Sequence, residues 1–198
     1  GKGRIDTIQP PPNGATKAKL IPKNAHYLGE PSSKYTFVLF SDFQCPTCKR
    51  IAPEIDQEIK ALKGKVAMVY RHFQARPDHI HSRHLAIIAE AAGKQGKFWE
   101  MHDWLYDNQD VMIGEDPEKA DEALKRAIKK MGLNETKFEE DRKSDACRIA
   151  YEQDQKDGED IPIKGTPAMF VIEPDGKIQE ITGQDAMHKW MVSLKDAK

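Results

Sequence analysis

The amino-acid sequence predicts an α/β fold that contains an inserted α-helical subdomain. Near the start of the chain, two strand-like segments flank a helical one, and the chain ends with a strand hairpin and a helix. Between these two parts the pattern of apolar residues is helical throughout. We therefore expect an N-terminal extended arm at residues 1–33, an α/β domain at residues 34–76 and 160–198, and a helical insertion at residues 77–159.

Composition limits the classes of protein to which this chain can belong. The 198 residues include 31 Lys and Arg against 32 Asp and Glu, and this balance argues against a nucleic-acid-binding protein. No apolar run is long enough to cross a bilayer as a helix. The chain starts with Gly1-Lys2-Gly3 and shows no signal-peptide pattern, so we expect a processed or trimmed chain that has lost any export signal.

The N-terminal segment is rich in residues that favour extended and turn conformations. Three prolines at positions 10–12 are followed by Asn13 and Gly14, and a Gly-Glu-Pro step stands at positions 29–31. This composition is typical of an extended arm or tether that leads to the first core element. Within the arm, a short strand is predicted at residues 18–21.

A strand, a helix and a second strand are predicted in this order over residues 35–70. Residues 35–40 form a nearly continuous apolar run of β-forming residues, as expected for a central strand that is buried on both faces. Apolar residues then recur at helical spacing as far as Gly64, and residues 66–70 form another buried strand. The two neighbouring cysteines therefore lie at the carboxyl end of the first strand of a βαβ unit.

The insertion is predicted to contain four helices. The first two carry apolar stripes at helical spacing. The third begins at Asp116-Pro117, an N-cap followed by proline at the first helical position, and it ends at Gly132. Asn134 is expected to cap a fourth helix that runs to about Lys156.

The chain is predicted to return to β-structure after the insertion. Residues 168–172 and 177–181 read as strands, and a Glu-Pro-Asp-Gly turn signal at positions 173–176 makes the pair a hairpin. Asp185 is expected to cap a final helix.

The motif Cys45-Pro46-Thr47-Cys48 stands at the predicted start of the first helix. A disulfide between residues three apart is feasible there, and the unpaired N–H groups and the helix dipole stabilise a thiolate at Cys45. Cysteines in such positions have pKa values of about 3.5–7.5. Pro46 suits the first turn because it lacks the N–H that would be unpaired. We expect an exposed Cys45 and a buried Cys48 that can attack a mixed disulfide on Cys45.

Half of a structural zinc site is the main alternative interpretation of this motif. A structural zinc site needs four ligands, usually from two knuckles of the CxxC or HxxxH kind. The sequence has no second knuckle, and Cys147 is remote from the motif in the sequence. Redox chemistry is therefore favoured over metal binding.

Two segments of the chain resemble signature loops of the thioredoxin superfamily. Residues 40–53, which hold the two cysteines, resemble its active-site segment, and Pro53 matches the proline that kinks the helix after the motif. Gly165-Thr166-Pro167, followed by a strand, resembles its cis-proline loop. The resemblance implies that the Thr166–Pro167 peptide bond is cis and faces the cysteines.

A third segment narrows the resemblance to one family. Residues 90–102 resemble the helical hairpin that DsbA-like thiol-disulfide oxidoreductases insert into the thioredoxin fold, and the whole resemblance covers about residues 25–198. It implies a thioredoxin fold, with a central mixed sheet flanked by helices and an inserted α-helical subdomain. It also implies an enzyme that exchanges disulfides with protein substrates outside the cytoplasm.

The resemblance also implies the parts of the reaction. The implied partners are proteins that carry thiols or disulfides, and a membrane or soluble redox partner that recycles the site. Neither an organic cofactor nor a metal is required, and the implied location is periplasmic or otherwise extracytoplasmic. The implied site residues are the catalytic pair Cys45 and Cys48, the intervening Pro46 and Thr47, and the substrate-binding cis-proline loop Thr166 and Pro167.

The direction of electron flow is left open by the sequence. A dithiol oxidase is favoured, but a disulfide reductase or isomerase would use the same residues. Two alternatives come from other classes of protein: a metal carrier that uses the two cysteines with a histidine of the insertion, and a peptide-binding chaperone without redox turnover.

One position departs from the pattern of the family. A buried carboxylate often stands six residues before the first cysteine and is credited with proton transfer, and that position is Leu39 here. The proton relay is therefore absent or moved. Asp42, Lys49 and Glu54 are close in the sequence, but nothing in the sequence places any of them under Cys48.

Two other features of the sequence invite a functional interpretation. Cys147 lies beside apolar residues and is expected to be a partly buried structural thiol, with a regulatory or intermolecular disulfide as the alternative. His79, His81 and His84 lie at the predicted entry to a helix, where polar residues commonly satisfy backbone groups, so a structural role is favoured over a metal cluster.

Overall fold

A single mixed sheet forms the centre of the computed structural model, which describes residues 6–196. The sheet has six strands in the order β1-β6-β5-β3-β4-β2. β3 and β4 run parallel, and each of the other neighbouring pairs is antiparallel. The strands are β1 (Thr7–Gln9), β2 (His26–Leu28), β3 (Tyr35–Ser41), β4 (Val66–His72), β5 (Ala168–Ile172) and β6 (Ile178–Thr182). The predicted α/β fold with a central mixed sheet is confirmed.

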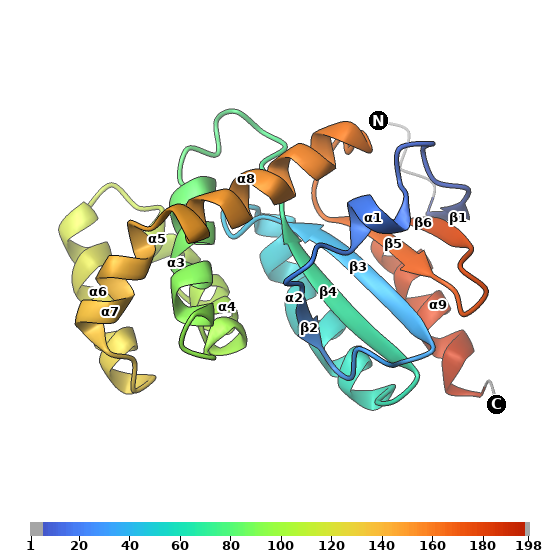
Figure 1. The fold of residues 1–198 in the computed structure, drawn as a ribbon, viewed down its shortest axis with the longest axis horizontal. Coiled ribbons are helices and arrows are strands. Elements are labelled where there is room, and N and C mark those ends of the chain that lie inside the picture. Colours follow the sequence, from blue (N-terminus) through green and yellow to red (C-terminus); the bar gives the residue numbers. More distant parts are fainter. Residues whose placement is uncertain (1–5, 197–198) are drawn as a thin grey trace.

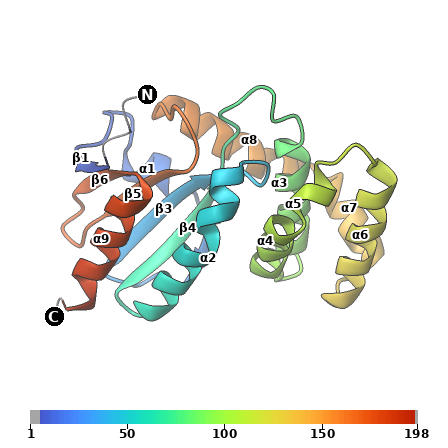
Figure 2. The same ribbon diagram turned by 180° about the vertical axis from the view of Figure 1, so that it is seen from behind.

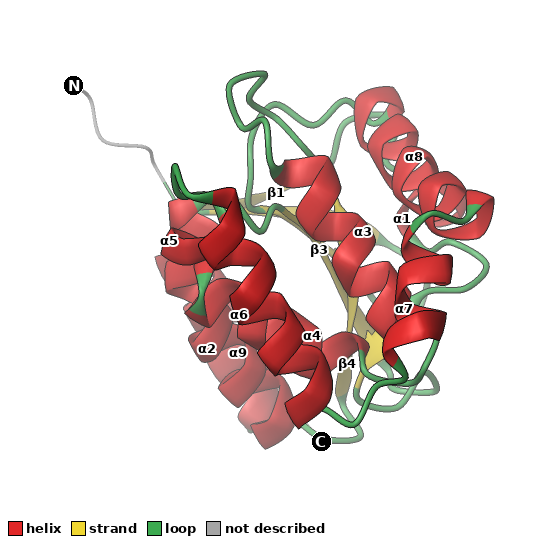
Figure 3. Cartoon of the chain, turned by 90° about the vertical axis from the view of Figure 1, so that its left-hand side faces the viewer, coloured by secondary structure: helices red, strands yellow, loops and turns green. Residues whose placement is uncertain are grey.

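Helices cover both faces of the sheet, and others lie beside it. The helices are α1 (Lys17–Leu20), α2 (Pro46–Ala61), α3 (Ser82–Gly93), α4 (Phe98–Asp107), α5 (Gln109–Met112), α6 (Pro117–Lys130), α7 (Glu135–Arg142), α8 (Asp145–Asp160) and α9 (Gln184–Lys195). α2 and α9 lie on one face, and α1 and α8 lie on the other (Figure 1, Figure 3). The helices α3 to α7 lie at one end of the sheet, and α8 leads from them back across it (Figure 1, Figure 2). The predicted helical insertion is therefore present.

The central strand β3 is buried on both faces because its alternate residues enter two different cores. Phe37 and Leu39 belong to the apolar cluster that contains the inner residues of α2 and α9. Val38 and Phe40 belong to a second cluster, on the side of α1, with Leu20. This continuous apolar character is what the sequence predicts for a strand with helices on both sides.

The N-terminal segment contributes to the sheet, which differs from the predicted extended arm. β1 adds to the outer edge of β6, and β2 adds to the outer edge of β4. Residues 17–20 form α1 and not the predicted strand, because the hydroxyl of Thr16 accepts a hydrogen bond from the N–H of Lys19 and caps a helical turn. The division of the chain into an arm, a domain and an insertion stays a prediction.

The last predicted helix of the insertion is divided into two. Asn134 caps α7 as expected, but α7 ends at Arg142. Ser144 then accepts a hydrogen bond from the N–H of Cys147 and caps a new helix, α8. The final helix α9 also begins differently, because Gly183 and not Asp185 occupies its N-cap position.

A buried arginine fastens the insertion to the sheet. Arg71 of β4 is fully buried, and its guanidinium donates hydrogen bonds to Asp154 at 2.7 Å and to Asp157 at 2.6 Å, both on α8. It also donates to the carbonyl oxygens of Lys19 and Leu20 at the end of α1. The guanidinium therefore joins α1, α8 and β4 in one network.

Within residues 6–196, no helix combines the length and the apolar character needed to cross a membrane.

Candidate active site

The two neighbouring cysteines lie where β3 gives way to α2. Cys45 is the N-cap of α2, and its sulfur accepts a hydrogen bond from the backbone N–H of Cys48 at 3.2 Å. Pro46 occupies the first helical turn, and Pro53 lies inside the helix. Both cysteines are free thiols in this structure. This is the helix-start geometry that the sequence predicts for the pair.

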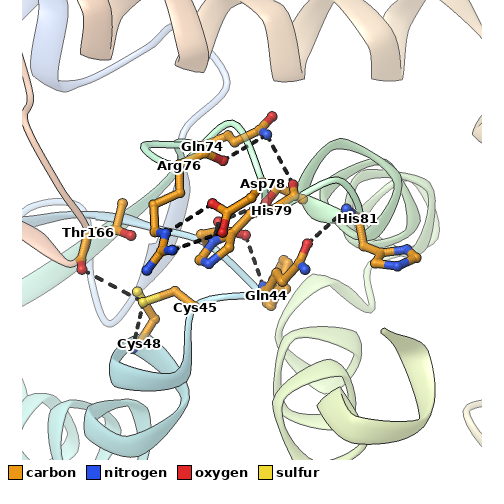
Figure 4. Close-up of polar contacts among 12 residues, drawn as sticks. Gln44, Cys45, Cys48, Gln74, Arg76, Asp78, His79, His81 and Thr166 are labelled. Atoms are coloured by element: carbon orange, nitrogen blue, oxygen red, sulfur yellow. Dashed lines mark hydrogen bonds and ion pairs between the residues drawn. The ribbon is translucent and has the colours of Figure 1, made fainter. Parts of the chain in front are cut away.

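Cys45 is less exposed than the sequence predicts. Only 5% of its surface is accessible, compared with 1% for Cys48. The carbonyl oxygen of Thr166 lies 3.7 Å from the sulfur of Cys45, and the side chain of Arg76 reaches toward the same sulfur (Figure 4). Two loops from different parts of the chain therefore shield Cys45, and a sequence pattern around the cysteines alone does not reveal either of them.

The two thiols have very different acidities. The pKa of Cys45 is lowered to about 6, chiefly because the thiol of Cys48 hydrogen-bonds its thiolate, with further help from the backbone N–H of Cys48 and from Thr166, while burial opposes the effect. The pKa of Cys48 is raised well above its usual value, chiefly by burial. At neutral pH, Cys45 is therefore a thiolate and Cys48 a thiol.

The loop of Thr166 and Pro167 lies against Cys45, as the resemblance implied. The Thr166–Pro167 peptide bond is cis. A second peptide bond, between Ile161 and Pro162, is also cis, and the sequence analysis did not predict it. A groove of about 370 Å³ begins beside Pro167 and continues along β6. The groove runs along the edge of the loop that touches the active-site sulfur.

Leu39 is buried in the core, so the usual position of the family's carboxylate is apolar. Of the nearby candidates, Asp42 is the buried one, and its backbone N–H contacts the thiol of Cys48. Its carboxylate accepts hydrogen bonds from Ser82 at 2.8 Å, from His79 at 3.0 Å, and from the N–H of Gln44 at 2.9 Å. These donors hold the negative charge of Asp42 in place.

The other two candidates for the missing carboxylate differ from Asp42. Glu54 faces α9, where it contacts Gln184 and His188. Lys49 is a cation on α2 and not a carboxylate. Neither side chain is among the groups that affect the pKa of Cys48 most strongly.

A glutamine of the insertion holds the backbone in front of α2. The carboxamide of Gln109 donates hydrogen bonds to the carbonyl oxygens of Phe43 at 2.7 Å and Cys45 at 3.2 Å. The ring of Phe43 packs against Tyr70 and Tyr106. The sequence interpretation missed Gln109, because its partners are backbone atoms more than sixty residues away.

The loop between β4 and α3 brings a charged pair to the site. The guanidinium of Arg76 makes two hydrogen bonds to the carboxylate of Asp78, at 3.0 and 2.8 Å. Gln74 shapes the loop by donating to the carbonyl oxygens of Arg76 and His79 (Figure 4). Arg76 and Cys45 attract each other electrostatically. Arg76 therefore adds positive charge beside the thiolate, and the sequence interpretation missed it as well.

The three histidines near the start of α3 do not gather at one point. His79 contacts Asp42, and the N–H of His81 donates to the side chain of Gln44.

Cys147 lies in the core of the insertion and is fully buried, which raises the pKa of its thiol. Its burial is more complete than the sequence predicts.

Within residues 6–196, one group of side chains is close enough together to hold a cation. It comprises Asp56 of α2 with His102 and Asp103 of α4, whose ligand atoms lie within 4.8 Å of one another. The Nδ1 of His102 is 2.8 Å from the carboxylate of Asp103. Neither of the two neighbouring cysteines belongs to this group.

Comparison with known sequences identifies related proteins. A sequence model of the family described as thioredoxin matches residues 22–191. The Na(+)/H(+) antiporter NhaA 1 of Mycolicibacterium gilvum is 30% identical over 170 residues, which cover 84% of this chain and 26% of the antiporter. The Na(+)/H(+) antiporter NhaA 3 of Salinispora tropica is 34% identical over 153 residues, which cover 76% of this chain and 22% of the antiporter. The chain thus spans about a quarter of the length of these curated relatives.

Comparison with solved structures gives matches over nearly the whole chain. The thiol-disulfide exchange protein alpha-DsbA2 of Wolbachia pipientis matches with a TM-score of 0.70 and 22% identity, covering 89% of this chain and 90% of its own. Oxidised BdbD of Bacillus subtilis matches with a TM-score of 0.69 and 20% identity, covering 98% of this chain and 100% of its own. At these identities the matches establish a shared fold.

Proposed function

The chain belongs to the thioredoxin family, and from this premise we propose that it is a DsbA-like thiol-disulfide oxidoreductase with Cys45 and Cys48 as its redox pair. The observation that carries the proposal is the position of the Cys45 sulfur at the start of α2, where it accepts the N–H of Cys48 and lies beside the Thr166–Pro167 loop, an arrangement that lowers the pKa of Cys45. A stabilised thiolate next to a resolving thiol is what disulfide exchange requires.

The proposed reaction proceeds in two exchange steps. In the oxidising direction, a substrate thiolate attacks the sulfur of Cys45, the Cys45–Cys48 bond breaks, and Cys48 leaves with the electron pair and takes up a proton. A second substrate thiolate then attacks the substrate sulfur of the mixed disulfide. The substrate disulfide forms, and Cys45 leaves as a thiolate. The substrate loses two electrons and the protein gains them.

The low pKa of Cys45 supports the oxidising direction over the reducing one. Because the pKa of Cys45 is lowered to about 6, its thiolate is stabilised at neutral pH, which makes the reduced form more stable. A more stable reduced form makes the disulfide a stronger oxidant. A reductase or isomerase would use the same two residues with Cys45 as the attacking group. The two directions therefore differ in the redox potential and not in the identity of the site.

The loop of Thr166 and Pro167 is proposed to bind the substrate segment next to its cysteine. The carbonyl oxygen of Thr166 lies beside Cys45, and the groove along β6 begins at the same loop. An extended peptide that binds beside this loop can form backbone hydrogen bonds with it, as in strand addition. The proposed substrates are therefore proteins with extended or unfolded segments around a cysteine.

We place the protein outside the cytoplasm, because dithiol oxidation needs an oxidising compartment and a partner that recycles the disulfide. The solved structures that share this fold include a thiol-disulfide exchange protein. Ion transport is not proposed for this chain, because it matches only 26% of the first of the antiporters and 22% of the other.

A trapping experiment tests the proposal. Cys48→Ser should accumulate mixed disulfides between Cys45 and reduced, unfolded model proteins, because the resolving thiol is missing. Cys45→Ser should lose both the reduction of insulin and the oxidation of reduced model proteins. Cys147→Ser is the matched control, because it removes a buried thiol outside the site.

The outcomes separate the competing functions. Substantial exchange by Cys45→Ser would refute the mechanism. If the wild type exchanges no disulfides but binds copper or zinc through its cysteines in native mass spectrometry, a metal carrier replaces the enzyme. If peptide binding survives the loss of both cysteines and no exchange is seen, a chaperone replaces it.

A further inference from the structure

Three buried hydroxyl groups form a connected row beneath the redox pair. The hydroxyl of Ser41, at the end of β3, lies 2.6 Å from that of Tyr106 in α4. The hydroxyl of Tyr106 lies 3.1 Å from that of Tyr70 in β4. None of the three side chains is more than 4% exposed. The row therefore links the sheet to the helical insertion through hydrogen bonds that are shielded from water.

One end of the row meets the resolving cysteine. The hydroxyl of Ser41 is close enough to the sulfur of Cys48 to lower the pKa of its thiol. Each hydroxyl has one hydrogen to donate and can accept another bond. The row can therefore be ordered in one direction, with Tyr70 donating to Tyr106, Tyr106 to Ser41, and Ser41 to the sulfur of Cys48. In this order all three dipoles point toward the sulfur.

We propose, on the basis of the redox function proposed above, that the hydroxyls of Ser41, Tyr106 and Tyr70 stabilise the transient thiolate of Cys48. They would do so where the family often uses a carboxylate, whose position is Leu39 here. A hydrogen bond to a charged group is stronger than one to a neutral group, and a low dielectric strengthens it further. The row therefore favours the thiolate of Cys48 over its thiol. Ser41 acts on the reacting sulfur directly, whereas Tyr106 and Tyr70 are positioning residues that act through Ser41.

The row acts on the same bond in both directions of exchange. When the mixed disulfide is resolved, the Cys48 thiol loses its proton to solvent and its thiolate attacks the sulfur of Cys45. The Cys45–Cys48 bond forms, the bond to the substrate breaks, and the substrate sulfur takes the electron pair and then a proton. In the oxidising direction, Cys48 is the leaving group. By microscopic reversibility, stabilising its thiolate lowers both barriers equally.

The other charged and titratable groups around Cys48 do not supply this stabilisation. Cys45, on the same helix, is itself a thiolate in the reduced protein and disfavours a second negative charge nearby. The carboxylate of Asp42 is already held by His79 and Ser82. The ring of His102 packs on Tyr70 and Tyr106. Besides the backbone N–H of Asp42, the row therefore supplies the side-chain donors near the sulfur.

A structural role for the same hydroxyls makes a different prediction. Buried hydroxyl groups need partners, so the row could simply satisfy its own members. Removing one oxygen would then lower stability without changing the rate at which Cys48 reacts. A role in exchange predicts slower reaction of Cys48 in both directions, with the redox potential at neutral pH unchanged, because the reduced Cys48 is then a thiol.

Stopped-flow kinetics with an aromatic disulfide distinguishes these roles. Dithionitrobenzoate should react with the reduced protein in two phases, attack by Cys45 and then resolution by Cys48, and each phase should release one coloured thiolate. Ser41→Ala should slow the second phase about tenfold at pH 7, the size expected for losing a hydrogen bond to a charged group. Tyr106→Phe should slow it less, and the first phase should stay within about twofold. These two variants remove only an oxygen and preserve packing.

The control and the reverse reaction complete the test. Tyr151→Phe removes a hydroxyl from an equally buried tyrosine, 5% exposed, and should leave both phases unchanged. Oxidation of dithiothreitol by the disulfide forms of Ser41→Ala and Tyr106→Phe should slow by the same factors as resolution, while their equilibrium with glutathione should match the wild type.

Each outcome bears on one proposal. Unchanged second phases in Ser41→Ala and Tyr106→Phe would overturn the role of the row and leave the redox function intact. Slower phases accompanied by a matching change in the glutathione equilibrium would overturn it too. A wild type without a second phase would instead contradict the proposed function itself.

Discussion

The carboxamide of Gln109 donates a 2.7 Å hydrogen bond to the carbonyl oxygen of Phe43. Gln109 belongs to α5 of the insertion, and Phe43 belongs to the segment that leads from β3 into Cys45. Gln109 is 4% exposed, so water does not readily replace this bond. Through this bond, the insertion therefore fixes the position of the backbone that leads into Cys45.

The first prediction concerns this contact. Gln109→Ala leaves two carbonyl oxygens without their buried donor, so it should lower the free energy of unfolding by about 1–3 kcal/mol and slow disulfide exchange at Cys45. Denaturant unfolding and insulin reduction measure the two effects. Gln179→Ala is the control, because that carboxamide bonds Glu173 within the β5–β6 hairpin. Equal effects of the two variants on exchange would contradict a positioning role for Gln109.

The second prediction concerns the pH dependence of alkylation. Iodoacetamide reacts with thiolates, so modification of Cys45 in the native reduced protein should rise with pH around a midpoint near 6. Cys48 and Cys147 should react far more slowly, because burial raises the pKa of each. Peptide mass spectrometry after brief labelling reports all three sites. Comparable labelling of Cys45 and Cys48 at mildly acidic pH would be incompatible with this account.

The third prediction links the same thiolate to stability. The pKa of Cys45 is about 6 in the folded protein and about 8.5 for a free thiol, so the unfolded state binds more protons between these values. The reduced protein should therefore gain free energy of unfolding, relative to the disulfide form, as pH rises from 6 to about 8.5. It should lose this gain as pH falls through 6.

Denaturant unfolding of both redox forms at several pH values provides the measurement for this linkage. Above about pH 8.5 the raised pKa of Cys48 acts in the opposite sense, so the comparison is confined to the range below it. The disulfide form has no thiol at Cys45 and serves as the internal control. Parallel stability curves for the two forms across this range would show that the Cys45 thiolate is not stabilised by folding.

The fourth prediction concerns the buried arginine. Arg71→Met leaves Asp154 and Asp157 without their cation inside the protein, so it should lower the free energy of unfolding by about 3–5 kcal/mol. Arg148→Met is the matched control, because Arg148 makes similar contacts with two carboxylates at the surface and should matter little. If both substitutions had the same small effect on the free energy of unfolding, Arg71 would not stabilise the contact between the insertion and the sheet.

Local signals in the sequence were sufficient for much of the fold. The N-cap at Asp116 with proline at position 117 marks the start of α6, and the turn at residues 173–176 joins β5 to β6. The same kind of signal placed Cys45 at the start of α2, where its sulfur accepts the N–H of Cys48. In each case the residues that decide the structure are neighbours in the chain.

Features that depend on distant partners were not predicted. β1 and β2 are three residues each, and only the free edges of β6 and β4 make them strands. Ser144 divides the long helix that was predicted, because its side chain caps the start of α8. Helical spacing of apolar residues continues across this position and does not indicate the break. Arg76 and Gln109 reach the site from other elements, so no spacing around the cysteines indicates them.

The equilibrium redox potential of the Cys45–Cys48 couple tests the central claim most directly. Incubation in glutathione buffers of defined ratio, followed by acid quenching and separation of the two forms, gives the value. The assignment as an oxidase predicts a potential near that of a strong dithiol oxidant, about −120 mV. A potential near about −270 mV, typical of a reductant, would contradict the assignment as an oxidase.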